Sequence, residues 1–544
     1  MRAKRTESQP VRFLGRKSRS GLQLFMIVVA AVAFLGLSAC SFNSEEPATV
    51  TLPEHGTTTS TTSSSVPPNQ GARSAEEAPP KLAWAVQVGG PGEDLLNAVT
   101  GSQNSVLAVG STSQGIGQPV VGGTDILSVS VDSAGALKST DQFGTAADES
   151  AAGVAAAGKT SLACGSTTGL LGSTSGGASG GGLGDSTTQT TSDAWCAPLP
   201  STSTQQVTQF GGSGSERVTG LALPSAAIQK NGVGAAGFAS GTTDGYLPGA
   251  EDPAGRGLGG GDALAFRIAA DGSALWARQF GTAANDAALG VCAVAQDGVF
   301  VGFTDGDLEG RSKGLRDAWI SRIDGKGVQR WITQFGGAGT EEFRAVAAAG
   351  EARQGTEQFI AVGSTDGDID QSGPLTNKGS TDAIVTAFAS DGTVRWATQL
   401  GSQFDDVATA VTADGTNIYV AGTTRSSQGA AGTPAEGTAA SGTAADGAAG
   451  TGVGELNPEI GPGGGTDAFL ASIDAETGKV RWVMRMGSAT DDATTGLTTT
   501  EGGLLVLSGI TTGKVASTPP AGGTDGFLLA FQLPTGGGAA ASSV

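Results

Sequence analysis

The feature that most constrains this chain is a pattern that occurs seven times along it. A glycine that ends a Gln-x-Gly pattern marks each copy, at intervals of 55 to 86 residues, and only the last copy has Arg485 in place of the glutamine. Five residues after the glycine every copy has an acid, and further along every copy has an aspartate before an apolar stretch. The marker glycines are Gly89, Gly144, Gly211, Gly281, Gly336, Gly401 and Gly487; the acids are Asp94, Glu149, Glu216, Asp286, Glu341, Asp406 and Asp492; the aspartates are Asp125, Asp193, Asp262, Asp317, Asp382, Asp467 and Asp525. Such a repeat predicts one supersecondary unit used seven times.

Each copy has the pattern of four β-strands. In the fourth copy, residues 287–295 are small and apolar, residues 298–303 alternate, and residues 317–323 and 328–335 flank the hairpin turn at residues 324–327. The 90 glycines of the chain suit many short strands joined by tight turns. Four strands per copy, repeated seven times, predict an all-β fold: a seven-bladed β-propeller of four-stranded blades.

The copies resemble the SBBP family of bacterial β-propeller repeats. The resemblance lies in a W-x-x-Q-x-G start, a middle pattern seen at residues 109–112 and 420–423, and the Gly-Gly-Thr-Asp-Ala-Phe end at residues 464–469. It covers roughly residues 82–534. The resemblance implies the propeller fold, and it implies no enzymatic activity because the family has none in common.

Crowding at the axis predicts the order of strands within a blade. The strand after the conserved acid has the smallest side chains, as in residues 151–157, so we expect it to be innermost. The strand that bears tryptophan in most copies is then outermost and pairs with the aspartate strand of the preceding copy. The first copy begins with an unpaired tryptophan strand (residues 82–88) and the last ends with an unpaired aspartate strand (residues 525–533), so pairing of the two closes the ring.

The N-terminus has the features of an export signal. A basic region is followed by an apolar run from Leu22 to Leu37 and then by Leu-Ser-Ala-Cys at residues 37–40. This sequence resembles the lipobox of bacterial lipoproteins, which implies cleavage before Cys40, a diacylglycerol on its thiol and acylation, for example by palmitate, of the new N-terminus. An uncleaved anchor helix is the alternative. The expected organisation is a signal peptide (1–39), a disordered Ser/Thr/Pro-rich tether (40–80), the propeller (81–534) and a disordered tail (535–544), with the protein lipid-anchored on the extracytoplasmic face of a cell membrane.

Composition excludes several classes of function. His55 is the only histidine and lies in the tether, which argues against histidine-based catalysis and metal sites. Residues 1–39 contain seven of the 31 basic and one of the 51 acidic residues, so the remainder has a net charge of −26. Such a surface repels nucleic acid and favours cations or basic partners.

Three groups of residues are candidate sites. The seven acids are expected to cap their turns by accepting backbone N–H bonds, and a ring that binds cations or a basic partner is the alternative. Cys164 and Cys196 fall on neighbouring strands of the second copy and are expected to form a disulfide in an oxidising compartment. Oxygen-bearing side chains alternate in two segments as they do in calcium loops, although Asn377 stands where an EF-hand starting at Asp366 would have its glutamate, and a solvated acidic loop is the alternative. The candidate calcium ligands are Asp366, Asp368, Asp370 and Ser372 in the first segment, and Asp305 and Asp307 in the second.

Two functions from different classes are compatible with these features. The first is a monomeric, non-catalytic recognition module for a protein or glycan, whose specificity lies in the long connections between the second and third strands. The second is a structural or assembly factor of the cell envelope, since residues 474–482 resemble the tryptophan docking motif of PQQ-like propellers, which also occurs in non-catalytic outer-membrane assembly lipoproteins. The chain has no adjacent cysteine pair and no sialidase-type Asp box, so we do not expect an enzyme.

Overall fold

The computed structural model describes residues 79–102, 105–172, 191–201, 204–225, 236–250, 259–308, 310, 312–349, 357–369, 375, 377–425, 465–517 and 520–533. The predicted signal peptide, Cys40, most of the predicted tether and the predicted tail lie outside this range, as do Asp370 and Ser372. Within the described part of the chain, no helix is long and apolar enough to span a membrane.

The described residues form seven antiparallel sheets of four strands each, which we number as blades. Blade 1 contains β2 (Asp94–Gly101), β3 (Ser105–Thr112), β4 (Asp125–Asp132) and β5 (Leu137–Phe143); blade 2 contains β6 (Glu149–Ala157), β7 (Thr160–Thr167), β8 (Asp193–Pro198) and β9 (Thr208–Phe210). Blade 3 contains β10 (Glu216–Ala222), β11 (Gly237–Thr243), β12 (Asp262–Ile268) and β13 (Ala274–Phe280); blade 4 contains β14 (Asp286–Val294), β15 (Asp297–Thr304), β16 (Asp317–Ile323) and β17 (Gln329–Phe335). Blade 5 contains β18 (Glu341–Ala349), β19 (Gln358–Thr365), β20 (Asp382–Ala389) and β21 (Val394–Leu400); blade 6 contains β22 (Asp406–Asp414), β23 (Asn417–Arg425), β24 (Thr466–Asp474) and β25 (Val480–Met486); blade 7 contains β26 (Asp492–Thr499), β27 (Leu504–Thr511), β28 (Asp525–Gln532) and β1 (Lys81–Val88).

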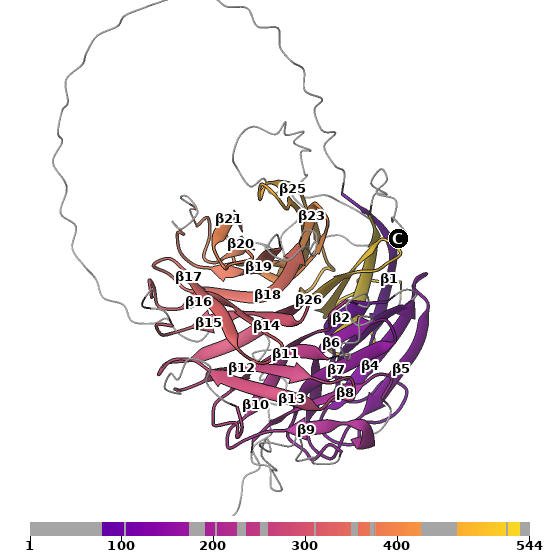
Figure 1. Ribbon diagram of the computed structural model, residues 1–544. Coiled ribbons are helices and arrows are strands. Elements are labelled where there is room, and N and C mark those ends of the chain that lie inside the picture. The colour runs from indigo at the N-terminus through magenta and orange to yellow at the C-terminus, as the bar shows by residue number, and fades with distance from the viewer. Residues whose placement is uncertain are drawn as a thin grey trace, which may run out of the picture. The chain divides into compact units, whose positions relative to one another are not determined.

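The predicted seven-bladed propeller is therefore confirmed, as is the predicted order of strands. In every blade the strand that begins with the conserved acid is the first of the sheet, and these seven strands together line one cavity on the axis of the ring. Blade 7 joins the two ends of the chain: β1 pairs with β28 from Lys81↔Gln532 to Val88↔Gly526. In Figure 1 the indigo β1 lies beside the yellow C-terminal strands.

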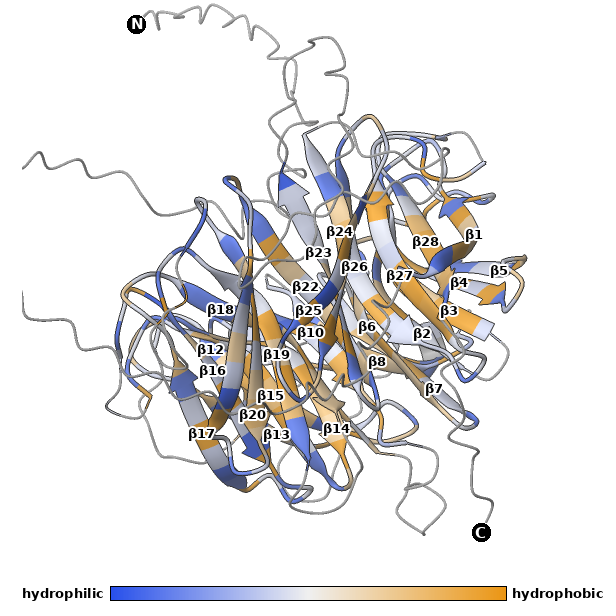
Figure 2. Cartoon of the chain, turned by 90° about the horizontal axis from the view of Figure 1, so that it is seen from above, coloured by the Kyte–Doolittle hydropathy of each residue, from blue (hydrophilic) through white to orange (hydrophobic). Residues whose placement is uncertain are grey.

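The hydrophobic core lies between blades rather than within them. Each of the seven clusters of buried apolar residues combines side chains of two adjacent blades, for example Phe343 and Phe359 of blade 5 with Ile320 of blade 4. The strands in Figure 2 accordingly carry most of the hydrophobic colouring. Because each sheet is apolar on both faces, a blade is stable only against its neighbours, which explains why the fold must close.

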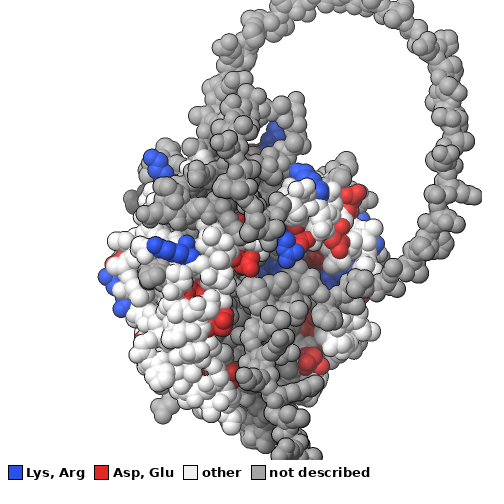
Figure 3. All heavy atoms as spheres, turned by 180° about the vertical axis from the view of Figure 1, so that it is seen from behind, with Lys and Arg blue, Asp and Glu red and all other residues white. Residues whose placement is uncertain are grey.

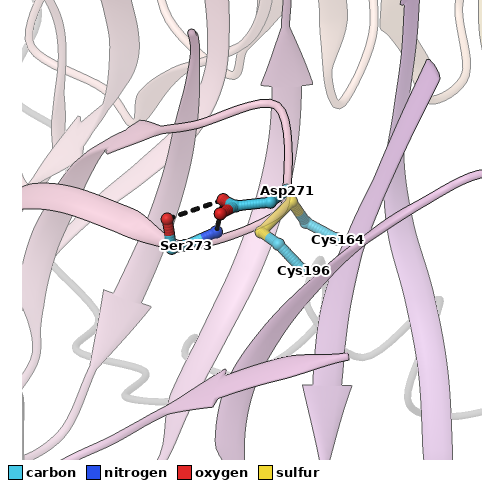
Figure 4. The surroundings of a disulfide bond; sticks show 4 residues. All are labelled: Cys164, Cys196, Asp271 and Ser273. Atoms are coloured by element: carbon cyan, nitrogen blue, oxygen red, sulfur yellow. Dashed lines mark hydrogen bonds between the residues drawn. A yellow bond between two sulfur atoms is a disulfide. The ribbon is translucent and has the colours of Figure 1, made fainter. Parts of the chain in front are cut away.

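Cys164 and Cys196 lie directly opposite each other on β7 and β8 and form a disulfide. Both side chains are fully buried. The turn between β12 and β13 of blade 3, with Asp271 and Ser273, lies next to this bond (Figure 4). A Cβ on Gly272 of that turn would lie 2.7 Å from the carbonyl oxygen of Cys196, so blade 3 packs closely on the disulfide-bearing strand.

The connections divide between two faces of the ring. We call the loop face the side that has the connections between second and third strands, and the turn face the opposite side. The loop face has long connections at residues 168–192, 244–261, 366–381 and 426–465, as expected.

Short turns between third and fourth strands, such as residues 133–135 and 391–392, predict that the turn face has no long connection, and this prediction is wrong. Long connections also occur there at residues 223–236, between β10 and β11, and at residues 350–357, between β18 and β19. A third, at residues 199–207, includes the short 3-10 helix η1 (Thr204–Gln206). Lengthening a surface loop costs little entropy wherever its two ends are held by strands, so neither face is protected from insertions.

Candidate functional site

The strand-opening aspartates are buried anchors of the loop face. Each lies at the start of a third strand and is at most 2% exposed. In six blades its Oδ2 accepts a hydrogen bond of 2.6 to 2.9 Å from the glutamine side chain of the Gln-x-Gly pattern. In blade 6 Arg485 replaces the glutamine and forms an ion pair with Asp467. The repeated glutamine is thus the partner that makes burial of the carboxylate tolerable.

The seven conserved acids that open the innermost strands cap the turns before them. In every blade one carboxylate oxygen accepts the backbone N–H of the residue four positions earlier, at 2.6 to 2.8 Å. The other oxygen accepts a threonine hydroxyl from the second strand in several blades, as Glu341 does from Thr365 at 2.8 Å. The expected capping role is confirmed.

We call a junction the place where the strand-opening aspartate of one blade lies near the conserved acid of the next blade. The marker glycine lies at this place. A Cβ on Gly336 would lie 2.1 Å from Oδ1 of Asp317 and 2.7 Å from Oε2 of Glu341, and the other six marker glycines are similarly confined. None of these seven glycines has a positive φ, so the position requires glycine for space and not for backbone conformation.

Burial of these paired carboxyls changes their acidity. It raises the pKa of Glu216 and of Glu341 to about 7, and the facing aspartates, Asp193 and Asp317, add to the rise. Burial likewise raises the pKa of Asp492 to about 6, with a further contribution from Asp467. Near neutral pH Glu216 and Glu341 are therefore about half protonated, whereas free carboxyls are ionised there.

Replacing Gly336 by alanine should destabilise the propeller by about 1–3 kcal/mol or more, because the new methyl group meets two carboxylates that their own hydrogen bonds hold in place. Urea unfolding measures the change. Gly502→Ala is the matched control: its Cβ would have no neighbour nearer than Thr500 Oγ1 at 3.7 Å, and its φ is not positive. Equal midpoints for the two variants would contradict the steric role of the marker glycine.

The candidate calcium ligands that the structure describes already have protein partners. Asp366 Oδ1 accepts the N–H of Thr340 at 2.6 Å, and Asp368 Oδ1 accepts that of Asn377 at 2.8 Å. Asp305 forms a bidentate ion pair with Arg316, with 2.7 Å between Nε and Oδ1 and 3.3 Å between Nη2 and Oδ2. Asp307 lies in the same loop as Asp305. Among the described residues no three acidic, histidine or cysteine side chains lie together as metal ligands would. Asp370 and Ser372 lie outside the described residues, so calcium at the first segment stays a prediction.

The tryptophan docking motif latches blades together. Trp396 of blade 5 donates its indole N–H to the carbonyl of Ala475 at 3.2 Å and packs on Gly478, in the turn between β24 and β25. Trp84, Trp276 and Trp331 dock in the same way on the turns of the blades that follow them. This motif therefore has a structural role in the ring.

The charges on one face of the described residues are dispersed. On the face in Figure 3 acidic and basic side chains are interspersed among uncharged ones. Large apolar side chains are more informative: the described residues include seven that are at least 50% exposed. Val121, Leu170, Tyr246 and Leu315 lie in the loop-face connections of blades 1 to 4, one per blade, and are 66, 54, 53 and 79% exposed; Leu137, Leu275 and Val328 lie at or next to the starts of outermost strands, towards the turn face.

Neither a family model nor a curated protein sequence matches this chain. Among solved structures it is similar to an endosialidase of phage phi92 (9% identity, TM-score 0.39, 85% of this chain and 70% of the other). It is also similar to BamB from Moraxella catarrhalis (11% identity, TM-score 0.36, 81% and 86%) and to an acylaminoacyl peptidase of Pyrococcus horikoshii (10% identity, TM-score 0.36, 81% and 52%). This chain thus spans about half the length of the peptidase. At such values the similarity says nothing about activity, and the fold rests on the strand pairing itself.

Proposed function

We propose that this chain is a lipid-anchored, extracytoplasmic propeller of SBBP-type repeats that binds a protein partner through its loop face and catalyses no reaction. The observation that carries the proposal is the series Val121, Leu170, Tyr246 and Leu315, one exposed apolar side chain in the loop-face connection of each of four successive blades. Apolar side chains that recur on one face are typical of protein interfaces.

The chemistry of this series favours a protein over a glycan. Three of the four side chains are aliphatic, and these offer a sugar neither a stacking surface nor a hydrogen bond. The net charge of −26 after residue 39 favours a partner with basic groups around an apolar centre. A calcium ion held by Asp366, Asp368, Asp370 and Ser372 would instead allow an acidic partner to bind, because the cation would bridge the two sets of carboxylates.

Replacing Val121, Leu170, Tyr246 and Leu315 together by serine should abolish partner capture from solubilised envelope, with a loss of at least about tenfold. Replacing Leu137, Leu275 and Val328 by serine is the matched control, since these side chains are similarly exposed but lie towards the turn face. Cross-linking followed by mass spectrometry measures the capture. A partner that survives the loop-face change and is lost with the control would show that the turn face is the binding face.

Charge neutralisation tests the expected nature of the partner. Changing Asp366, Asp368 and Asp370 together to asparagine should weaken binding, and binding to the unchanged protein should fall with added salt. Loss of binding with a chelator would identify the calcium-bridged form. Recovery of a stoichiometric membrane complex that none of these variants disrupts would instead favour the structural or assembly role.

Lipid anchoring is tested at the cysteine of the lipobox. Cys40→Ala should leave an unprocessed precursor without acyl mass, because cleavage requires the lipid-modified thiol at this position. Intact-mass measurement of the membrane fraction reads both effects. Normal processing and membrane retention of the variant would contradict the proposal.

A further inference from the structure

The axis of the ring holds a cavity of about 180 Å³ that the innermost strands of all seven blades line. Each of these strands has a register shift at the same place, where one extra residue interrupts its pairing with the second strand. The residue at the bulge lies three positions after the conserved acid and lines the cavity in every blade; these residues are Asn97, Ala152, Thr219, Leu289, Arg344, Thr409 and Thr495. A bulge changes the direction of a side chain, and here it occurs where the strand forms the wall of the cavity.

Most of the polar bulge residues link neighbouring blades. Asn97 of blade 1 donates to the carbonyl of Ala151 in blade 2 at 2.9 Å, and Thr219 of blade 3 donates to the carbonyl of Ala288 in blade 4 at 2.7 Å. Thr495 of blade 7 donates likewise to Leu96 of blade 1 at 2.5 Å. These side chains have a structural role and need no ligand.

Arg344 breaks this pattern. It is the one ionisable residue among those that line the cavity, and it is the largest side chain at a bulge. It forms an ion pair with Glu342, which Arg316 also approaches, with 3.6 Å between Nη1 of Arg316 and Oε2 of Glu342. Its Nε is buried and has no hydrogen-bond partner among the described residues. The side chain of Arg344 is 23% exposed, so protein atoms do not fully enclose its charge.

We propose that the axial cavity binds a small monocarboxylate, whose two oxygens pair with the guanidinium of Arg344 and whose apolar part lies against Leu289 and Val291 of the neighbouring blade. A guanidinium presents parallel N–H donors that match a carboxylate. Glu342 holds the guanidinium from one side and neutralises part of its charge, which disfavours dianions such as sulfate. A cavity of this size accommodates a ligand of about the size of benzoate, since apolar cavities of roughly 150 Å³ admit benzene.

Benzoate is the probe for this site, with benzamide as its uncharged analogue. Isothermal titration of the intact propeller should show one benzoate site and at least about tenfold weaker binding of benzamide. Arg344→Gln should weaken benzoate binding at least about tenfold, and Arg344→Lys should weaken it to a smaller extent, because an ammonium keeps the charge but not the paired donors. Arg217→Gln is the matched control: this arginine also follows a conserved acid on an innermost strand, but it is exposed and does not line the cavity.

Leu289→Trp keeps the test decisive if Arg344 proves necessary for folding. The larger side chain fills the cavity from the neighbouring blade and should abolish binding while Arg344 is intact. Thermal unfolding of each variant shows whether it is folded. Failure of benzoate to bind the unchanged protein, equal binding of benzamide, or unchanged binding in both Arg344→Gln and Leu289→Trp would overturn the proposal.

Discussion

Deletion of residues 81–89 should open the ring and produce an aggregating chain, whereas deletion of residues 41–78 should leave the stability of the propeller unchanged. The first deletion removes β1, and with it the pairing to β28 and the hydrogen bond of 2.8 Å from Gln87 to Asp525. It also removes the contact of Trp84 with the carbonyl of Ser133 in blade 1. An unpaired apolar strand edge then faces solvent, which is a template for association.

Size-exclusion chromatography and thermal unfolding of the two truncations measure this difference. We expect the shorter chain without residues 41–78 to elute as a monomer with an unchanged midpoint, since that stretch has the composition of a segment that buries no core. Equal midpoints and equal elution for the two truncations would count decisively against closure by β1.

The propeller should be more stable near pH 5 than near pH 8, which is a large effect because it adds over several junctions. The unfolded chain releases the protons of Glu216 and Glu341 near pH 4.5, whereas the folded chain holds them up to about pH 7. Between these values the folded state binds more protons, so stability falls as the pH rises. For each of these two carboxyls the loss above pH 7 amounts to roughly 3 kcal/mol.

Thermal or urea unfolding across pH 4.5 to 8 measures this profile. Glu341→Gln should raise the midpoint at pH 8 and leave it nearly unchanged at pH 5, because the amide keeps an acceptor for the N–H of Gly337 and cannot ionise. Glu501→Gln, at an exposed turn position, is the control and should change neither midpoint. A profile that rises from pH 5 to pH 8 would contradict the assignment of these junctions as proton-holding.

Much of the fold was predictable because its constraints recur at fixed sequence offsets. The marker glycine, the acid five residues later and the strand-opening aspartate meet at one place in every blade. Because every blade needs the same contact, the same residue types recur seven times in the sequence. Closure of the ring followed from two unpaired strands at the chain ends. The long connections of the turn face were not predictable by the same reasoning, since loop length does not recur from one copy to the next.

The candidate sites were less accessible to sequence reasoning. Exposure of Val121 and Leu315 depends on the path of single loops, which no offset encodes. Alignment of the seven copies does distinguish Arg344, because the other six copies have an uncharged residue at the third position after the acid. Its significance depends on the bulge at this position on the wall of the cavity, and the alternation of side chains along a strand does not reveal where a bulge occurs.

The distribution of tryptophan latches makes the stability of the ring uneven. Blade 2 has no latch on either side, because Ser139 and Gln206 occupy the tryptophan positions of blade 1 and blade 2. The disulfide between Cys164 and Cys196 joins two strands of that blade to each other and to no neighbour. We therefore expect native-state amide exchange to identify blade 2 as the cooperative unit that separates first, with its second and third strands, β7 and β8, held together as it opens.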